Sequence, residues 1–455
     1  MNRNFRKLTL MLVLLLFAGL IVACGDSTPT TTPATPIPVT ATAVPVVATK
    51  PTTTAVIEVP TVTPTTIATT TPATTSAIST TAATTTTAAV VTPTPTRSNL
   101  LAYVENGNVY TLDTDTKEKK QVVDGTKLGA SGDIALSAQG NMLAASLRGQ
   151  NGVDSLYLSN LKDAPTKLVS EQPAATSDSD PEFSSDGKFL LFTRILDSNK
   201  DGKYDFKDKH ELWITELGNI NPRKLADGQQ GAWASDSKRI VFVTDGRIPA
   251  DYNYATENAV HIINNEGKNE WEPINTKKFP SDWSQSGFPF QVFPEFINSP
   301  AFVDGGKQIA FTTLGHSGLL FSLNATDGKE LKLWSTNYEG GFNRVLGAPG
   351  SSLMVVEGLP ATGVMDLDIF DSSKAQPKLD ASTETKIGGV RAGFGATKPA
   401  WSADGKKLAY IKTGTSSSAT GAVRGTLVVV TLSGQNVASW VELGSGTYSV
   451  LAWAK

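Results

Sequence analysis

The sequence is poor in the residues that most often stabilise exported proteins or build metal and catalytic sites. Its 455 residues include one cysteine, Cys24, so no disulfide can form within the chain. The fold must therefore rest on its hydrophobic core or on bound metal. The three histidines, His210, His261 and His316, show no spacing that joins them into a metal triad. No cluster of Lys and Arg provides a basic patch for phosphate groups, which argues against nucleic acid as a partner.

The N-terminus has the pattern of an export signal. Arg3, Arg6 and Lys7 precede an apolar run over residues 8–23 that is too short for an ordinary membrane span. We therefore expect a signal peptide over residues 1–23, and its removal takes three positive charges from the formal net charge of -3, leaving -6. A signal peptide places the rest of the chain outside the cytoplasm.

The signal peptide ends at a cysteine, in the order Val22-Ala23-Cys24-Gly25. This segment resembles the bacterial lipobox, in which the cysteine is diacylated, for example with palmitate, and becomes the mature N-terminus. The resemblance implies a lipoprotein anchored to the cell membrane through Cys24 and exposed at the surface. The alternative is an uncleaved N-terminal anchor with a chance cysteine, and either arrangement tethers the chain to a membrane.

Residues 24–97 have the composition of a disordered stalk. About two-fifths of residues 27–96 are Thr, most others are Ala, Pro or Val, and Lys50 and Glu58 are the only charges. Such a segment cannot form a packed core. Extended at ~3 Å per residue, it could reach on the order of 200 Å. We interpret it as a spacer, either O-glycosylated on Thr or unmodified.

A repeat sets the fold class of residues 98–455. The clearest copies are residues 181–192 (PEFSSDGKFLLF) and 399–410 (PAWSADGKKLAY), each a short strand, an Asp-Gly turn and a second strand. The copies are roughly 44 to 69 residues apart, as in a propeller with inserted loops. The large apolar residue that ends the first strand, used below as the reference residue, recurs at Leu136, Phe183, Trp233, Phe302, Leu346 and Trp401.

The two ends of the repeat region complement each other. Trp453 occupies a reference position with no strand after it, and residues 99–103 look like a second strand with no first. Pairing of these two segments would complete one blade and close the ring, which also removes exposed sheet edges. The sequence therefore predicts an all-β protein: a β-propeller after a disordered linker, most simply with seven blades, with six or eight as alternatives.

The motif Pro-Ala-Trp/Phe-Ser-x-Asp-Gly-Lys-x-Leu-Ala-Phe/Tyr resembles the WD40-like PD40 repeats of TolB-type propellers and of the propeller domains of dipeptidyl-peptidase-like enzymes. The similarity covers nearly all of residues 99–455 and implies a fold. It implies little about function, because one propeller scaffold serves many roles. The chain lacks the small α/β domain that precedes the propeller in TolB, and it lacks the hydrolase domain of the peptidases.

One insert has the spacing of a calcium loop. Residues 197–208 place oxygen donors at positions 1, 3, 5, 7, 9 and 12 and a glycine, Gly202, at position 6. Asp at position 12 in place of Glu, and flanking strands in place of helices, are departures from an EF-hand. We expect a structural Ca²⁺, with a solvated acidic loop as the alternative. The expected ligands are Asp197, Asn199, Asp201, the carbonyl of Lys203, Asp205 and Asp208.

The longest expected loops fall between second and third strands and between blades, which emerge on one face of a propeller. That face is the expected binding surface. An aromatic-rich insert there could stack on sugars or anchor a protein, or the rings could simply cover their own insert. The candidate ligand residues are Tyr252, Tyr254, Trp271 and Trp283.

No catalytic motif is recognisable. We therefore expect a monomeric, lipid-anchored module of the cell envelope that binds or scaffolds an envelope protein or polysaccharide and is not an enzyme. The alternative is an extracytoplasmic glycan hydrolase or lyase, with acidic residues on the long-loop face. Carboxylates across a central channel could also support glycoside chemistry, but sequence does not place two of them at a working separation.

Overall fold

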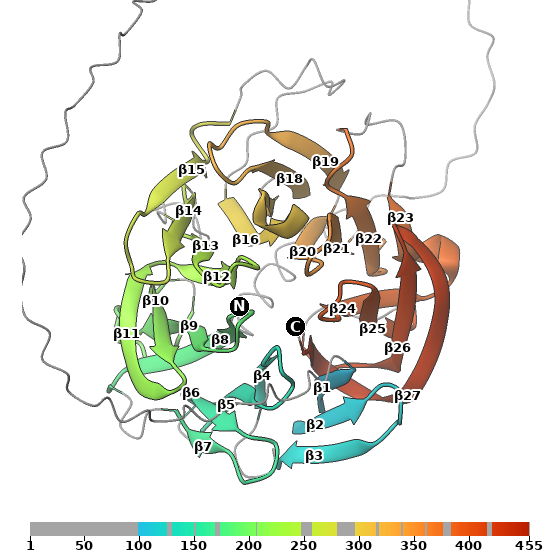
Figure 1. The fold of residues 1–455 in the computed structure, drawn as a ribbon, viewed down its shortest axis with the longest axis horizontal. Coiled ribbons are helices and arrows are strands. Elements are labelled where there is room, and N and C mark those ends of the chain that lie inside the picture. The colour runs from blue at the N-terminus through green and yellow to red at the C-terminus, as the bar shows by residue number, and fades with distance from the viewer. Residues whose placement is uncertain are drawn as a thin grey trace, which may run out of the picture. The chain divides into compact units, whose positions relative to one another are not determined.

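The computed structural model describes residues 99–454, with gaps at 125–129, 150–151, 169–172, 206, 247–256, 280–295, 315–317, 338–339, 360–361, 376–383 and 416–420. Twenty-seven antiparallel strands form six sheets in this part of the chain. Figure 1 shows them arranged as blades around a central axis. The described residues contain no helix with the length and apolar character needed to cross a membrane.

Five of the sheets are four-stranded blades that follow one another along the chain. Blade 2 contains β4 (Ala130–Leu136), β5 (Leu143–Arg148), β6 (Asp154–Ser159) and β7 (Thr166–Lys167). Blade 3 contains β8 (Thr176–Phe183), β9 (Phe189–Leu196), β10 (Lys209–Glu216) and β11 (Asn219–Asp227). Blade 4 contains β12 (Gln229–Trp233), β13 (Arg239–Val243), β14 (Ala259–Asn264) and β15 (Trp271–Asn275). Blade 5 contains β16 (Phe296–Val303), β17 (Gln308–Leu314), β18 (Gly318–Asn324) and β19 (Lys332–Asn337). Blade 6 contains β20 (Gly341–Gly347), β21 (Leu353–Leu359), β22 (Asp366–Asp371) and β23 (Thr385–Gly388).

The sixth sheet has seven strands and joins the two ends of the chain. Its order is β24-β25-β26-β27-β1-β2-β3, so it consists of two blades that share β27. With β27 counted in both, the described strands make seven four-stranded blades, the number that the repeat favoured. Blade 7 contains β24 (Gly395–Trp401), β25 (Lys407–Thr413), β26 (Val423–Ser433) and the first part of β27 (Asn436–Trp453). Blade 1 contains the end of β27, β1 (Leu100–Glu105), β2 (Asn108–Asp113) and β3 (Lys119–Val123).

The predicted pairing of the two ends is confirmed. Trp453 lies opposite Leu101, and Leu451 lies opposite Tyr103, in an antiparallel ladder between β27 and β1. Trp453 is 2% exposed and belongs to the hydrophobic cluster that joins blades 7, 1 and 2. The C-terminal strand therefore supplies the innermost strand of blade 1 and closes the ring.

The turn chemistry explains why the repeat forms hairpins. In blade 3 the carboxylate of Asp186 accepts hydrogen bonds from the Ser184 hydroxyl (2.7 Å) and the Lys188 amide (3.1 Å), while Gly187 adopts a φ of +68°. Ser237 replaces this glycine in blade 4 and still adopts a φ of +56°. Its hydroxyl accepts a hydrogen bond from the Asp186 amide at 2.9 Å, so the turns of blades 3 and 4 are linked.

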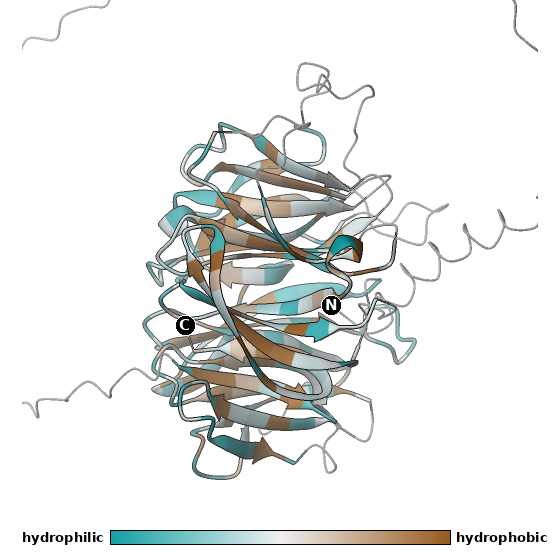
Figure 2. Cartoon of the chain, turned by 90° about the vertical axis from the view of Figure 1, so that its right-hand side faces the viewer, coloured by the Kyte–Doolittle hydropathy of each residue, from teal (hydrophilic) through white to brown (hydrophobic). Residues whose placement is uncertain are grey.

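The core lies between the blades. Each hydrophobic cluster contains buried residues from neighbouring blades, and the side view in Figure 2 shows apolar strands stacked within the ring. The reference tryptophans link adjacent blades through hydrogen bonds. Trp233 Nε1 donates to the Glu182 carbonyl and Trp401 Nε1 donates to the Leu346 carbonyl, both at 3.2 Å. The blades surround a central channel, and the packing between neighbouring blades fixes the walls of that channel.

Candidate functional site

A cavity of about 310 Å³ occupies the central channel. The inner strands of all seven blades line it, each with a short segment that contains its reference residue. The lining segments are 133–136, 180–183, 230–233, 299–302, 343–347, 399–401 and 450–453. The repeat that closes the ring thus also builds the cavity wall.

A bulge in the inner strand aims side chains into this cavity. The register of β8 on β9 skips from Ser179 to Glu182, and equivalent shifts occur in β12, β16 and β24. The residue three before the reference residue has a left-handed φ in these blades, for example +48° at Asp180 and +56° at Gln230. Such bulges re-aim side chains and are frequent beside functional sites. Backbone strain at non-glycine residues persists only where the surrounding structure imposes it.

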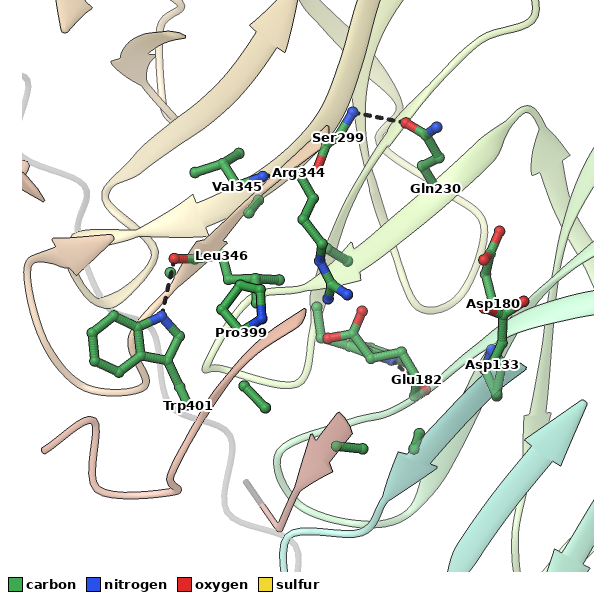
Figure 3. Close-up of a pocket in the computed structure, with 18 of the residues that line it drawn as sticks. Asp133, Asp180, Glu182, Gln230, Ser299, Arg344, Val345, Leu346, Pro399 and Trp401 are labelled. Atoms are coloured by element: carbon green, nitrogen blue, oxygen red, sulfur yellow. Dashed lines mark hydrogen bonds between the residues drawn. The ribbon is translucent and has the colours of Figure 1, made fainter. Parts of the chain in front are cut away.

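Polar side chains at the bulges fasten successive inner strands together. Gln230 of blade 4 donates from Nε2 to Asn298 Oδ1 at 2.7 Å, and its Oε1 accepts from the Ser299 amide at 2.7 Å. The Ser299 hydroxyl in turn accepts from the Val345 amide of blade 6 at 3.0 Å (Figure 3). These hydrogen bonds hold the wall from blade 4 to blade 6 in one geometry.

Four charged side chains line the cavity: Asp133, Asp180, Glu182 and Arg344. They come from blades 2, 3 and 6 and are half-buried. Figure 3 shows the guanidinium of Arg344 directed toward the carboxylate of Glu182, with Asp133 and Asp180 close together on the other side. Three carboxylates and one guanidinium give the lining a formal charge of -2 (-3 + 1).

A buried carboxylate behind the wall supports this charge arrangement. Glu357, 3% exposed, accepts a hydrogen bond from the Lys398 amide at 2.8 Å and another from the Thr397 hydroxyl. Burial alone would raise the pKa of Glu357, but the charge of Lys398, these hydrogen bonds and the charge of Arg344 hold that pKa below its ordinary value. Arg344 therefore lies within electrostatic reach of a second, buried carboxylate.

The cavity residues lie apart from the expected binding surface, which the long loops form, and none of them is among the predicted ligand residues. A signal was present in the repeat, because the residue three before the reference residue is polar in all six internal copies. Five of the six line the cavity, whereas Lys398 is buried beside Glu357. The six residues are Asp133, Asp180, Gln230, Ser299, Asn343 and Lys398.

The expected calcium loop, 197–208, links β9 to β10 and lies at the predicted place between second and third strands. The Asp197 carboxylate accepts hydrogen bonds from the amides of Asp201 and Gly202, both at 3.1 Å. The Asp208 carboxylate accepts from the amides of Ser198 (3.0 Å) and Asp205 (3.1 Å). The two ends of the loop therefore turn their carboxylates inward, onto the loop's own backbone.

The donor chemistry of this loop suits a hard cation, since its side chains offer carboxylate and amide oxygens. Burial raises the pKa of the Tyr204 hydroxyl, and the charges of Asp197 and Asp208 raise it further, as expected for a tyrosine beside both carboxylates. Within the part of the chain that the structure describes, however, no three His, Cys, Asp or Glu side chains gather into a metal-holding group. Occupancy by Ca²⁺ stays a prediction.

Of the four expected aromatic ligand residues, Tyr252, Tyr254 and Trp283 lie outside the described residues. Trp271 begins the outer strand β15, opposite Ile262, and packs half-buried against the core between blades 4 and 5. Its ring thus covers the blade. Cys24 also lies outside the described residues.

No family model matches the sequence, and no curated protein matches it. Solved structures of similar fold include TolB from Acinetobacter baumannii, at 12% identity over 76% of this chain and 78% of that one, with a TM-score of 0.39. The β-propeller domain of the Trilobed protease from Pyrococcus furiosus is 12% identical over 76% of this chain and 93% of that one, with a TM-score of 0.48. At this identity the likeness concerns the fold alone, and the expected resemblance to TolB-like propellers is confirmed at that level.

The expectation that the chain is not an enzyme is wrong as an exclusion, because solved structures with the same propeller fold include enzymes. Structures that share its propeller fold include an oligogalacturonate lyase in complex with manganese, at 15% identity over 68% of this chain and 82% of that one, with a TM-score of 0.45. A prolyl endopeptidase is a further example, at 13% identity. The absence of a familiar sequence motif therefore gives no ground for excluding catalysis, and these distant likenesses do not show that this chain is an enzyme.

Proposed function

We propose that this chain is a lipid-tethered propeller of the cell envelope that binds a protein partner in its central cavity. The partner would insert a segment carrying a Lys or Arg side chain or a free amino group. The observation that carries the proposal is the set of charged side chains that bulged inner strands aim into one cavity. Asp133, Asp180 and Glu182 outnumber Arg344 there.

The charge of the cavity supports a cationic group in the ligand. Charges that are half-buried in a narrow channel are screened less than charges on an open surface. A guanidinium or ammonium group could pair with Asp133 and Asp180, while Arg344 pairs with a carbonyl or carboxylate of the same segment. A cavity of about 310 Å³ lies at the small end of ligand pockets and suits a side chain or loop tip.

Crosslinking in intact cells tests this proposal. The chain would carry a photo-crosslinking residue at Asn343, whose backbone segment lines the cavity, and captured partners would be compared with those of an Asp180→Asn, Glu182→Gln variant. We expect the double variant to lose capture, because removing both carboxylates leaves Asp133 opposed by Arg344. Glu266→Gln, at a 65% exposed side chain in the β14–β15 turn, is the matched control and should retain capture. Equal capture by all three proteins would contradict the cavity as the site.

The tether is a separate part of the proposal, supported by the lipobox-like sequence at Cys24. Two acyl chains hold a protein at a membrane far more firmly than one. We expect the membrane-bound chain to incorporate a labelled fatty acid, and Cys24→Ser to abolish that label. A membrane-bound chain that carries no fatty acid before any substitution would instead indicate an uncleaved N-terminal anchor.

A second candidate, a glycan hydrolase or lyase, is supported by the three carboxylates in the cavity, since paired carboxylates perform glycoside hydrolysis. Turnover of a polysaccharide panel separates the two candidates. Hydrolysis that is lost on Glu182→Gln and retained on Glu266→Gln would favour the enzyme. Binding of a protein partner without turnover of any glycan would favour the first proposal.

A further inference from the structure

The outer strand of blade 7 is an exposed sheet edge. Residues 436–447 of β27 pair with β26 on one side, whereas the pairing of β27 with β1 involves only Tyr448–Trp453. Figure 1 shows β27 running along the periphery of the ring, and Figure 2 shows this side of the molecule. Among the described residues, no strand pairs with the outer side of residues 436–446, whereas the Thr447 carbonyl accepts a hydrogen bond from the Asn106 amide at 3.0 Å.

Every other blade protects its outer strand with Lys, Arg or Pro, the residues that block the addition of a further strand. β27 has none of these over residues 436–447 (NVASWVELGSGT), and Glu442 is its only charge. It is also the longest of the outer strands. The protecting residues elsewhere are Lys119 and Lys120 in β3, Lys167 in β7, Pro222, Arg223 and Lys224 in β11, Pro273 in β15, Lys332 in β19 and Lys386 in β23.

This edge, which lacks Lys, Arg and Pro, also carries exposed apolar side chains. Trp440 is 59% exposed, Val441 48% and Val437 39%. They are three of the five large apolar side chains that are exposed in the described part of the chain. An edge that combines free backbone groups with apolar side chains favours the addition of another strand.

We propose that this edge is an interface between two copies of the chain, which pair through β27 in an antiparallel ladder about a twofold axis. An antiparallel edge can pair with itself, because the twofold axis brings the same strand back in the opposite direction. Side chains opposite each other must lie on the same face. The ladder between β26 and β27 skips Ala438 and Leu443, so the regular part of the edge, in which alternate residues share a face, is 439–442. A continuous sheet from blade 7 of one copy to blade 7 of the other results.

The side chains favour a register centred on Trp440. Trp440 then faces Trp440 of the partner subunit, and Ser439 faces Val441 of the partner subunit, both within the regular part of the edge. Glu442, the only charge of the edge, lies two residues from the twofold axis and does not face its own copy; like charges directly opposite each other would be destabilising. The edge sequence is therefore compatible with itself in charge. This proposal departs from the monomer expected from the sequence.

Sedimentation over a concentration series tests the interface, using the chain from residue 24 with Cys24→Ser, which removes its only thiol and the proposed lipid anchor. We expect a reversible dimer, and Val441→Lys should weaken dimerisation by at least about tenfold because it introduces the charge that other outer strands carry. Ile220→Lys is the matched control, since Ile220 is 47% exposed on the protected strand β11, and it should leave dimerisation unchanged. A monomer at all concentrations, or a dimer that tolerates Val441→Lys, would overturn the proposal.

Oxidation of single cysteine variants tests the register. Directly opposed residues of antiparallel strands have Cα atoms about 4.5–5.5 Å apart, within disulfide range. In the same Cys24→Ser background, Trp440→Cys should yield an oxidised dimer at least about tenfold faster than Ile220→Cys, because only residue 440 faces its own copy. Equal rates for the two variants would refute the Trp440-centred ladder.

Discussion

If the C-terminal strand closes the ring, the buried Trp453 should contribute measurably to the free energy of unfolding. Its side chain is 2% exposed, and it packs in the cluster that joins blades 7, 1 and 2. A tryptophan buries about 150–250 Å², and Trp→Ala in a core costs about 3–5 kcal/mol, from lost burial and the cavity left behind. We expect Trp453→Ala to lower the free energy of unfolding by about this amount.

Trp440→Ala is the matched control, because it makes the same substitution in the same strand. Trp440 is 59% exposed, so its removal from the isolated chain should change the free energy of unfolding by no more than about 0.5 kcal/mol. Urea denaturation followed by far-UV circular dichroism, at high dilution to exclude self-association, measures both variants. If Trp453→Ala unfolds at the same urea concentration as the wild type, the terminal strand does not stabilise the ring and the closure argument fails.

Three further predictions concern buried charge and metal. Arg194 binds the Asp178 carboxylate through two hydrogen bonds of 2.8 and 3.0 Å in the core of blade 3, so Arg194→Ala should lower the free energy of unfolding in urea by about 3–5 kcal/mol by leaving Asp178 buried without its partner. Burial and the neighbouring Asp366 raise the pKa of Asp368 to about 7. Between about pH 4 and pH 7 the folded chain therefore keeps a proton that the unfolded chain releases, so the free energy of unfolding should fall as pH rises through this range. Urea titrations of Asp368→Asn should lack that fall. Calorimetry of chelator-treated protein should detect Ca²⁺ binding that Asp201→Ala abolishes, and an absence of binding heat in the unaltered chain would end the calcium proposal.

The fold could be predicted from sequence because its signal is local and repeated. The Asp186-Gly187 turn and the reference residue Phe183 specify a hairpin, and recurrence of the same frame specifies blades. Closure could be predicted because Trp453 ends a first strand that lacks a second, while residues 99–103 resemble a second strand that lacks a first. The cavity was harder to predict, because the polar residue three before the reference residue differs in type from blade to blade, and its direction is set by bulges and left-handed φ angles that the sequence does not show.

The open edge of β27 could not be predicted from the sequence either. A strand edge is defined by what does not pair with it, and residues 436–447 look like an ordinary fourth strand until the neighbours of β27 are known. The informative quantity is a difference between blades, namely Lys, Arg or Pro in six outer strands and none in the seventh. The same strand that closes the ring with its buried end, through Trp453, exposes Trp440 at its other end. Substitutions at these two tryptophans should therefore separate folding from association: Trp453→Ala should act on the stability of each monomer, whereas Val441→Lys beside Trp440 should act on the dimer and leave the monomer's unfolding unchanged.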